Sequence, residues 1–206
     1  MLQQLSKIIM FNLTSIVMLL RVPSVLIWIL PFIAAVIIWL LSLTPVAVAF
    51  SKPIQEIIAV CILTINTIVI LIAHVKMRKF VTLWLLLLGI ALLCRELHFY
   101  GTHRGFYIAL ILLVSWCAVK RVKFVQEIQS TGGARLLVGT MWMYCMAKVM
   151  DRDYLYFMPK YDEWHDYVEE SMESVGHIMI LAMSVIILRT WQKKISRSEE
   201  LKNLDI

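Results

Sequence analysis

The chain has few charged residues: only 17% of its 206 residues are Asp, Glu, Lys or Arg, whereas 61% are hydrophobic. An ordinary soluble domain is about 45–50% apolar and about 25% charged. A soluble globule of this size could not bury so much apolar surface, and a disordered chain would be polar and rich in charge. Glycine is also scarce, with 7 residues, and no repeat period is evident, which excludes collagen and solenoid folds. The composition therefore predicts a helical protein that crosses a membrane several times.

The sequence motifs of several protein classes are missing as well. The chain has no Gly-rich phosphate-binding loop, no GxGxxG and no GxSxG nucleophile turn. The four cysteines, which have no CxxC spacing, lie in or beside apolar runs, so we expect small core residues rather than disulfides or a thiolate metal site. These cysteines are Cys61, Cys94, Cys117 and Cys145. The net charge of +6 is explained by basic cytoplasmic loops that face anionic lipid, so we expect no nucleic-acid partner.

Apolar runs long enough to cross a membrane fill most of the chain, since a spanning helix needs about 20 residues. The predicted spans are residues 22–43, 56–73, 80–98, 105–119, 136–152 and 167–191. Residues 1–21 contain a shorter run with polar side chains, which predicts an amphipathic helix lying on the membrane surface. Residues 193–206 form a polar cytoplasmic tail. The predicted fold class is therefore all-α: a polytopic transmembrane bundle of about six spans within residues 22–192, preceded by an interfacial helix.

Lysine and arginine residues fall mainly at alternate ends of the predicted spans. They gather, for example, in the turn at residues 74–79 and in the polar connection at residues 120–135. Because cytoplasmic loops of membrane proteins carry an excess of these residues, such ends are expected to be cytoplasmic. Six spans then place both termini in the cytoplasm. If residues 8–20 crossed the membrane as a seventh span, the two termini would lie on opposite sides.

Most acidic residues and histidines fall at the opposite, outer ends of the spans. Asp166, Glu170, Glu173 and His177 follow one another at steps of four, three and four residues, which is one stripe of a helix. Ionisable groups at membrane depth are costly and rarely face lipid. We therefore expect this stripe to point into the helix bundle.

Two other predicted spans end in charged residues that can meet this stripe. Arg95 and Glu96 close one span, and Lys148 lies three residues before Asp151 on a shared helical face. The sequence therefore predicts one buried charged cluster near the outer face. Its predicted members are Arg95, Glu96, His98, Lys148, Asp151, Arg152, Glu169, Glu170, Glu173 and His177.

Three short motifs follow one another within residues 80–192: CRE-x-x-F, K-x-x-DR and EE-x-x-E. Their order resembles a widespread group of small bacterial polytopic membrane proteins of uncharacterised function. The matching residues are Arg95, Glu96, Lys148, Asp151, Arg152, Glu169, Glu170 and Glu173. The chain departs from the pattern at His98, where the group has an acid, and at Tyr100, where it has a histidine. The resemblance implies a multi-pass protein of the bacterial inner (plasma) membrane and names no activity.

Two non-enzymatic roles fit the predicted cluster. Its charges can form internal salt bridges that hold the helices together, since polar side chains link membrane helices. Alternatively, the cluster can bind a polar ligand, a cation or a lipid headgroup, either alone or as an accessory subunit of a larger membrane complex. The expected partners are membrane lipids and, in the second case, other membrane-protein subunits.

An enzymatic role is the remaining alternative, and the sequence leaves open whether the protein is an enzyme. Carboxylate and imidazole groups together suit a divalent metal such as Zn, Mn or Fe. The candidate ligands are His98, Glu170, Glu173 and His177. A metal held there could activate water against a lipid amide, ester or phosphate. In such a hydrolase Glu96 or Glu173 would be the general base, and Arg152 would hold the substrate oxyanion or phosphate.

Overall fold

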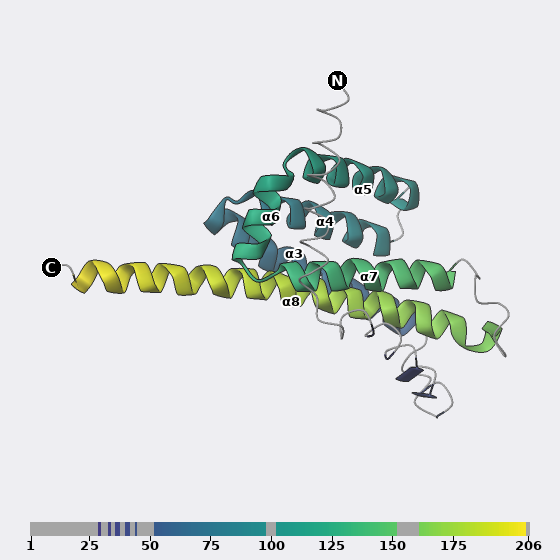
Figure 1. The fold of residues 1–206 in the computed structure, drawn as a ribbon. Helices are drawn as coiled ribbons and strands as arrows, with labels where there is room; N and C mark the ends of the chain where they lie inside the picture. Colours follow the sequence, from purple (N-terminus) through teal and green to yellow (C-terminus); the bar gives the residue numbers. More distant parts are fainter. Residues whose placement is uncertain are drawn as a thin grey trace, which may run out of the picture.

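A computed structural model describes residues 52–97, 102–151 and 161–204, together with a few single positions between residues 29 and 44. In this part of the chain all regular structure is helical and no strand occurs (Figure 1). The helices are α3 (Lys52–Met77), α4 (Phe80–Glu96), α5 (Thr102–Val119), α6 (Arg121–Ser130), α7 (Ala134–Asp151) and α8 (Tyr161–Leu204). The all-α class is thus confirmed. The predicted interfacial helix over residues 1–21 lies outside the described residues.

Helix α3 exposes large apolar residues, and its buried face includes two polar ones. Its buried residues recur every three or four positions, which is a single helical stripe. They are Gln55, Ala59, Leu63, Asn66, Ile70 and Ala73. The opposite face exposes large aliphatic side chains such as Ile57, Ile65 and Ile68. The exposed face of α3 is therefore unlike that of a surface helix in a water-soluble protein, which is polar.

Two of the described helices are long and apolar enough to cross a membrane, namely Lys52–Met77 and the His165–Arg197 part of α8. Only 28% of an apolar 18-residue stretch of the first helix is buried, against 56% of the corresponding stretch of the second helix. Residues Arg104–Val119 form a shorter apolar helix. The described fold is therefore compatible with a membrane location. It has two helices that meet this criterion where the sequence predicts five spans, and the sixth predicted span, residues 22–43, lies outside the described residues except for a few single positions.

Helix α8 packs against both α7 and α3, while α4 lies between α3 and α5 (Figure 1). The main core is aliphatic, and Leu63, Ile70, Leu85 and Met183 are almost completely buried in it. Helix α4 comes close to α3 at Gly89, where a Cβ atom would lie only 3.0 Å from the Asn66 side-chain nitrogen. Helices α7 and α8 run in opposite directions, as do α3 and α4, whereas α3 and α8 run parallel. The start of α3 and the ends of α4 and α7 therefore meet at the same end of the bundle.

The connection at residues 120–135 contains a helix that the sequence analysis did not predict. Helix α6 is only 10 residues long and mostly polar, which is why its hydrophobicity gave no signal of a helix. It is anchored by Phe124 and Ile128, one turn apart and both buried. Gly132, with φ of 73°, then turns the chain into α7.

The polar tail predicted at residues 193–206 continues α8 as far as Leu204. Figure 1 shows this end of α8 extending past the other helices. With 44 residues, α8 is about 66 Å long at 1.5 Å per residue. The predicted boundary between span and tail is therefore a change of composition within one helix rather than a break in it.

All four cysteines are free thiols, as predicted, but their predicted place in the core is wrong. Cys61, Cys94 and Cys145 are exposed, and Cys117 is half-buried. The core prediction failed because an apolar run shows that a segment avoids water without showing which of its faces packs against the bundle.

Candidate functional site

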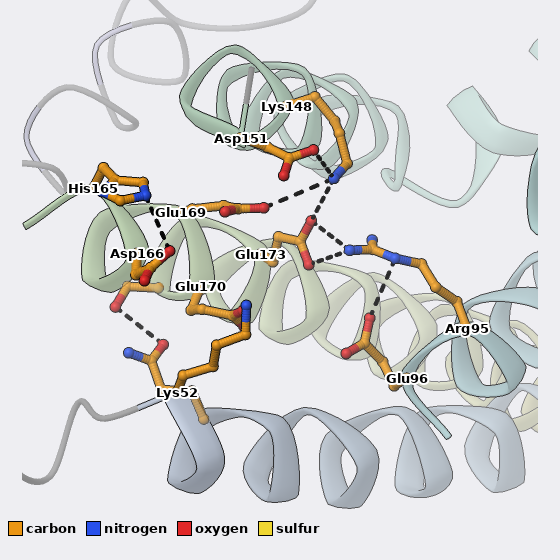
Figure 2. A network of polar contacts seen from close by, with 12 residues as sticks. Lys52, Arg95, Glu96, Lys148, Asp151, His165, Asp166, Glu169, Glu170 and Glu173 are labelled. Carbon is orange, nitrogen blue, oxygen red and sulfur yellow. Dashed lines mark hydrogen bonds and ion pairs between the residues drawn. The ribbon is translucent and has the colours of Figure 1, made fainter. Parts of the chain in front are cut away.

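Charged side chains from four helices meet at the end of the bundle where α3 begins and α4 and α7 end (Figure 2). We call this the outer end, and we call its charged group the outer cluster. The outer cluster consists of Lys52, Arg95, Glu96, Lys148, Asp151, Glu169, Glu170 and Glu173. The sequence predicted that charged ends of three segments meet at one site. The corresponding helices α4, α7 and α8 do meet there, and α3 contributes a fourth.

The deepest ion pair of the outer cluster joins α4 to α8. One terminal guanidinium nitrogen of Arg95 donates to both carboxylate oxygens of Glu173, each at 2.7 Å. The side chains are 18% and 5% exposed, so the pair is largely shielded from water. The Nε atom of Arg95 also lies 3.8 Å from Glu96 Oε1. Removal of either partner would leave a buried charge without its counter-charge, which is strongly destabilising.

Lys148 of α7 is the second centre of positive charge. Its Nζ atom donates to Asp151 Oδ2 at 2.7 Å. It also lies 3.8 Å from one oxygen of Glu169 and 3.8 Å from one oxygen of Glu173. These two distances are beyond hydrogen-bond range, so the attraction there is purely electrostatic. Lys148 is 33% exposed and Asp151 39%, which places this part of the cluster at the rim.

Helix α3 contributes contacts that the sequence analysis did not assign to the site. Lys52 Nζ lies 3.3 Å from Glu170 Oε1, and the Ser171 hydroxyl donates to the side-chain oxygen of Gln55 at 3.1 Å. Lys52 could have been included, because it begins the segment that leads inward from the outer end. The sequence did not show that α3 packs beside α8, so its partner Glu170 could not be identified.

His177 lies beneath the ion pairs and is completely buried. Its Nδ1 atom is hydrogen-bonded to the Tyr144 hydroxyl, and its Nε2 atom lies 3.8 Å from Glu96 Oε1. No hydrogen-bond partner of Nε2 occurs in the described part of the chain. A carboxylate facing Nε2 favours the tautomer with its proton there, so that Nδ1 accepts from Tyr144. Gly176 makes room for the tyrosine ring, because a Cβ atom there would lie 3.2 Å from Tyr144 Cζ.

The outer cluster holds more negative than positive charge. Its described members are five carboxylates and three cationic side chains. Glu96, Glu169 and Glu173 are all less than 9% exposed. Among these described members the carboxylates outnumber the cations by two, and Glu96 and Asp151 take part in further interactions besides those given above. Buried carboxylates in this number favour cationic partners at this end of the bundle.

Most of the predicted site residues belong to the outer cluster, and His177 lies directly beneath it. His98 and Arg152 lie outside the described residues. Tyr144 was missed, although it lies four residues before Lys148 and therefore on the same face of its helix. Asp166 belongs to the predicted stripe, but it is 58% exposed and pairs with His165 instead.

Of the predicted metal ligands, the three that the structure describes have different partners. Glu170 contacts Lys52, Glu173 contacts Arg95, and His177 uses Nδ1 for Tyr144. Within residues 52–97, 102–151 and 161–204, no group of three His, Cys, Asp or Glu side chains could hold a metal ion.

No protein-family model matches the chain, and neither a curated protein nor a solved structure matches it significantly. The function proposed for the protein therefore rests on the outer cluster.

Proposed function

We propose that the protein is an integral membrane protein of about six spans whose outer cluster binds a ligand that carries a positively charged group. The exposed aliphatic face of α3 supports the membrane location, because lipid is the solvent that would cover it. Helices α4, α5 and α7 have 17 or 18 residues, at the lower limit of about 17–25 residues for a spanning helix.

The distribution of basic residues supports the orientation. Lys76 lies in the last turn of α3, and Arg78 and Lys79 follow in the turn before α4. Lys120 connects α5 to α6, and Arg121 begins α6. Both groups are at the end of the bundle opposite the outer cluster. By the positive-inside rule this end faces the cytoplasm of a bacterial cell, and the outer cluster faces away from it.

The observation that carries the proposed ligand is the position of Glu169. This carboxylate is 8% exposed and lies 3.8 Å from Lys148, whose ammonium group is already bound to Asp151 at 2.7 Å. A cationic group at the partly exposed rim could reach both Glu169 and Asp151. It would offset the acid excess that the described side chains leave.

The hydrolase alternative with Glu173 as its general base receives no such support. A general base must be able to accept a proton from a substrate or a water. Both oxygens of Glu173 already accept from Arg95, and the predicted ligands form no metal site in the described residues.

The proposal is tested by ligand-dependent stability of the full chain in detergent micelles. Ethanolamine and phosphoethanolamine are the probes, and glycerol phosphate is the control that lacks an ammonium group. A ligand present at a hundredfold excess over Kd stabilises the folded state by about 2.7 kcal/mol. We expect both amines to raise Tm and glycerol phosphate to leave it unchanged.

Two variants make the test specific to the outer cluster. Glu169→Gln removes one buried charge and keeps the shape of the side chain, so the response to both amines should be lost. Asp166→Asn removes a charge from an exposed position on the same helix and should respond as the wild type does. A full response of Glu169→Gln, or equal stabilisation by glycerol phosphate, would contradict the proposal. Stoichiometric metal in the wild type that Glu169→Gln lacks would favour the metal site instead.

A further inference from the structure

An apolar groove of about 420 Å³ runs between α4 and α5. Small residues on both helices leave this space, namely Ala91 and Cys94 on α4 and Gly105 and Ala109 on α5. Bulkier aliphatic side chains of both helices, such as Leu112, form the rest of the lining. The groove is therefore an open hollow with an apolar lining.

The groove begins beside the outer cluster. Phe106 lines it, and the guanidinium carbon of Arg95 lies 5.8 Å from the centre of the Phe106 ring. A cation over an aromatic face at this distance is an attractive contact. Arg95 therefore touches the groove lining on one side and Glu173 on the other. One side chain separates the apolar groove from the charged site.

The direction of the groove follows from the spacing of its lining residues. On α4 they extend from Leu87 to Cys94, and on α5 from Gly105 to Leu113. Both sets cover about two helical turns, so the groove runs about 10 Å along the helices from the outer cluster toward the inner end. In a spanning bundle this is the direction in which a lipid chain descends from its headgroup.

We propose that this groove holds an acyl chain of a membrane lipid whose ammonium-bearing headgroup lies in the outer cluster. The inference rests on the proposed function and narrows the ligand from any cation to a lipid such as phosphatidylethanolamine. A water-soluble cation would use the charged rim and leave the adjoining groove unused. The acid excess of the cluster selects an ammonium headgroup over an anionic one, and the apolar lining accepts the chain.

The test is photolabelling of the full chain reconstituted in phosphatidylglycerol vesicles. A trace of phosphatidylethanolamine carries a diazirine in its acyl chain, and phosphatidylglycerol with the same diazirine is the parallel probe. Labelling of the groove is compared with labelling of the exposed α3 face at Ile57 and Ile65. We expect several-fold enrichment in the groove with the ethanolamine lipid and none with the glycerol lipid. Equal enrichment with both lipids would overturn the link to the cluster.

A matched pair of substitutions on α5 locates the effect. Ala109→Trp fills the groove and should abolish the enrichment, whereas Ala118→Trp makes the same change at an exposed position and should preserve it. Ala91→Leu fills the groove from α4 with a smaller side chain and serves if Ala109→Trp does not fold. Enrichment that survives in a folded groove variant would overturn the inference.

Soluble ethanolamine separates failure of this inference from failure of the proposed function. If ethanolamine stabilises the wild type but photolabelling is not enriched in the groove, the cation site is supported and the lipid assignment is contradicted. If ethanolamine has no effect on stability and photolabelling is not enriched in the groove, both the cation site and the lipid assignment are contradicted. The spacing of Gly105 and Ala109 would also suit close packing of a second helix. A dimer cross-linked through this face and dissociated by Ala109→Trp would replace the lipid with a second copy of the chain.

Discussion

At the inner end of the bundle, the contacts between helices include hydrogen bonds to neutral or backbone groups and aromatic packing. The carboxylate of Glu127 on α6 accepts a hydrogen bond from the backbone N–H of Val81 at 2.8 Å, in the first turn of α4. His74 and Thr82 are 3.0 Å apart at the turn between α3 and α4. The indole N–H of Trp84 donates to a backbone oxygen at 2.9 Å, and the ring packs edge-on against Phe124.

At the outer end, the contacts between helices are made mainly by charges of opposite sign. Arg95 and Lys148 each face more than one carboxylate, and His177 keeps a buried nitrogen without a hydrogen-bond partner among the described residues. Such an arrangement stabilises the fold less than packed apolar side chains would. The inner end is thus built to maintain the fold, whereas the costly charges of the outer end are what the proposed ligand site would require.

The largest expected effect comes from separating the buried pair of the outer end. Arg95→Met leaves Glu173 buried without its hydrogen-bonded cation and should lower the free energy of unfolding by about 3–5 kcal/mol. The measurement is denaturant unfolding in detergent micelles. The double variant Arg95→Met, Glu173→Met should recover most of the loss, since it removes both charges. If the losses of Arg95→Met alone and Glu173→Met alone simply add in the double variant, the two side chains do not stabilise the fold as a pair.

A smaller effect is expected one turn deeper, at the contact between α7 and α8. Tyr144→Phe removes the hydroxyl that donates to His177 and leaves the buried Nδ1 atom without that donor. The expected cost is about 1–3 kcal/mol in the same unfolding measurement. Tyr167→Phe is the control, because this ring is partly buried at the same end and its hydroxyl has no hydrogen bond in the described part of the chain. Equal losses in both variants would show that the Tyr144 hydroxyl has no special role.

The inner end should respond to mutation in stability alone. Glu127→Ala removes the side-chain acceptor at the start of α4, and loss of such a cap costs about 0.5–2 kcal/mol. Glu127→Gln retains an acceptor oxygen and should lose less. Both variants should still be stabilised by ethanolamine as strongly as the wild type. A weakened response to ethanolamine would mean that the two ends are coupled and would remove the division of roles between them.

The sequence was sufficient to predict the helical class and most of the outer cluster. Helical spacing placed Glu170, Glu173 and His177 on one stripe, and the alternation of basic ends brought Arg95 and Lys148 to the same level. Both arguments need only the geometry of single helices and the direction of each span. In the structure these residues do meet, since Glu173 lies beside both Arg95 and Lys148.

The missing parts of the prediction depend on how helices turn against one another. The pairs Lys52–Glu170 and Tyr144–His177 require knowledge of which face of α3 and α7 meets α8. Helical periodicity within one segment carries no information about its neighbour's rotation. The same limit explains why Lys52 of α3 was not expected beside Glu170, which was predicted as a cluster residue and candidate metal ligand.

The smallest effect is expected at the rim, where a salt bridge between α3 and α8 can be compared with the buried pair. Lys52 is 53% exposed and Glu170 14%, and their charged atoms are 3.3 Å apart. A double-mutant cycle with Lys52→Gln and Glu170→Gln should give a coupling energy of about 0–1 kcal/mol, as for other exposed pairs. Salt at about 1 M shortens the Debye length to about 3 Å and should abolish this coupling. The same salt should leave the Arg95–Glu173 coupling nearly unchanged, because little solvent reaches that pair. If both couplings fell alike, the outer cluster would be open to solvent throughout, and its buried carboxylates would no longer favour a bound cation.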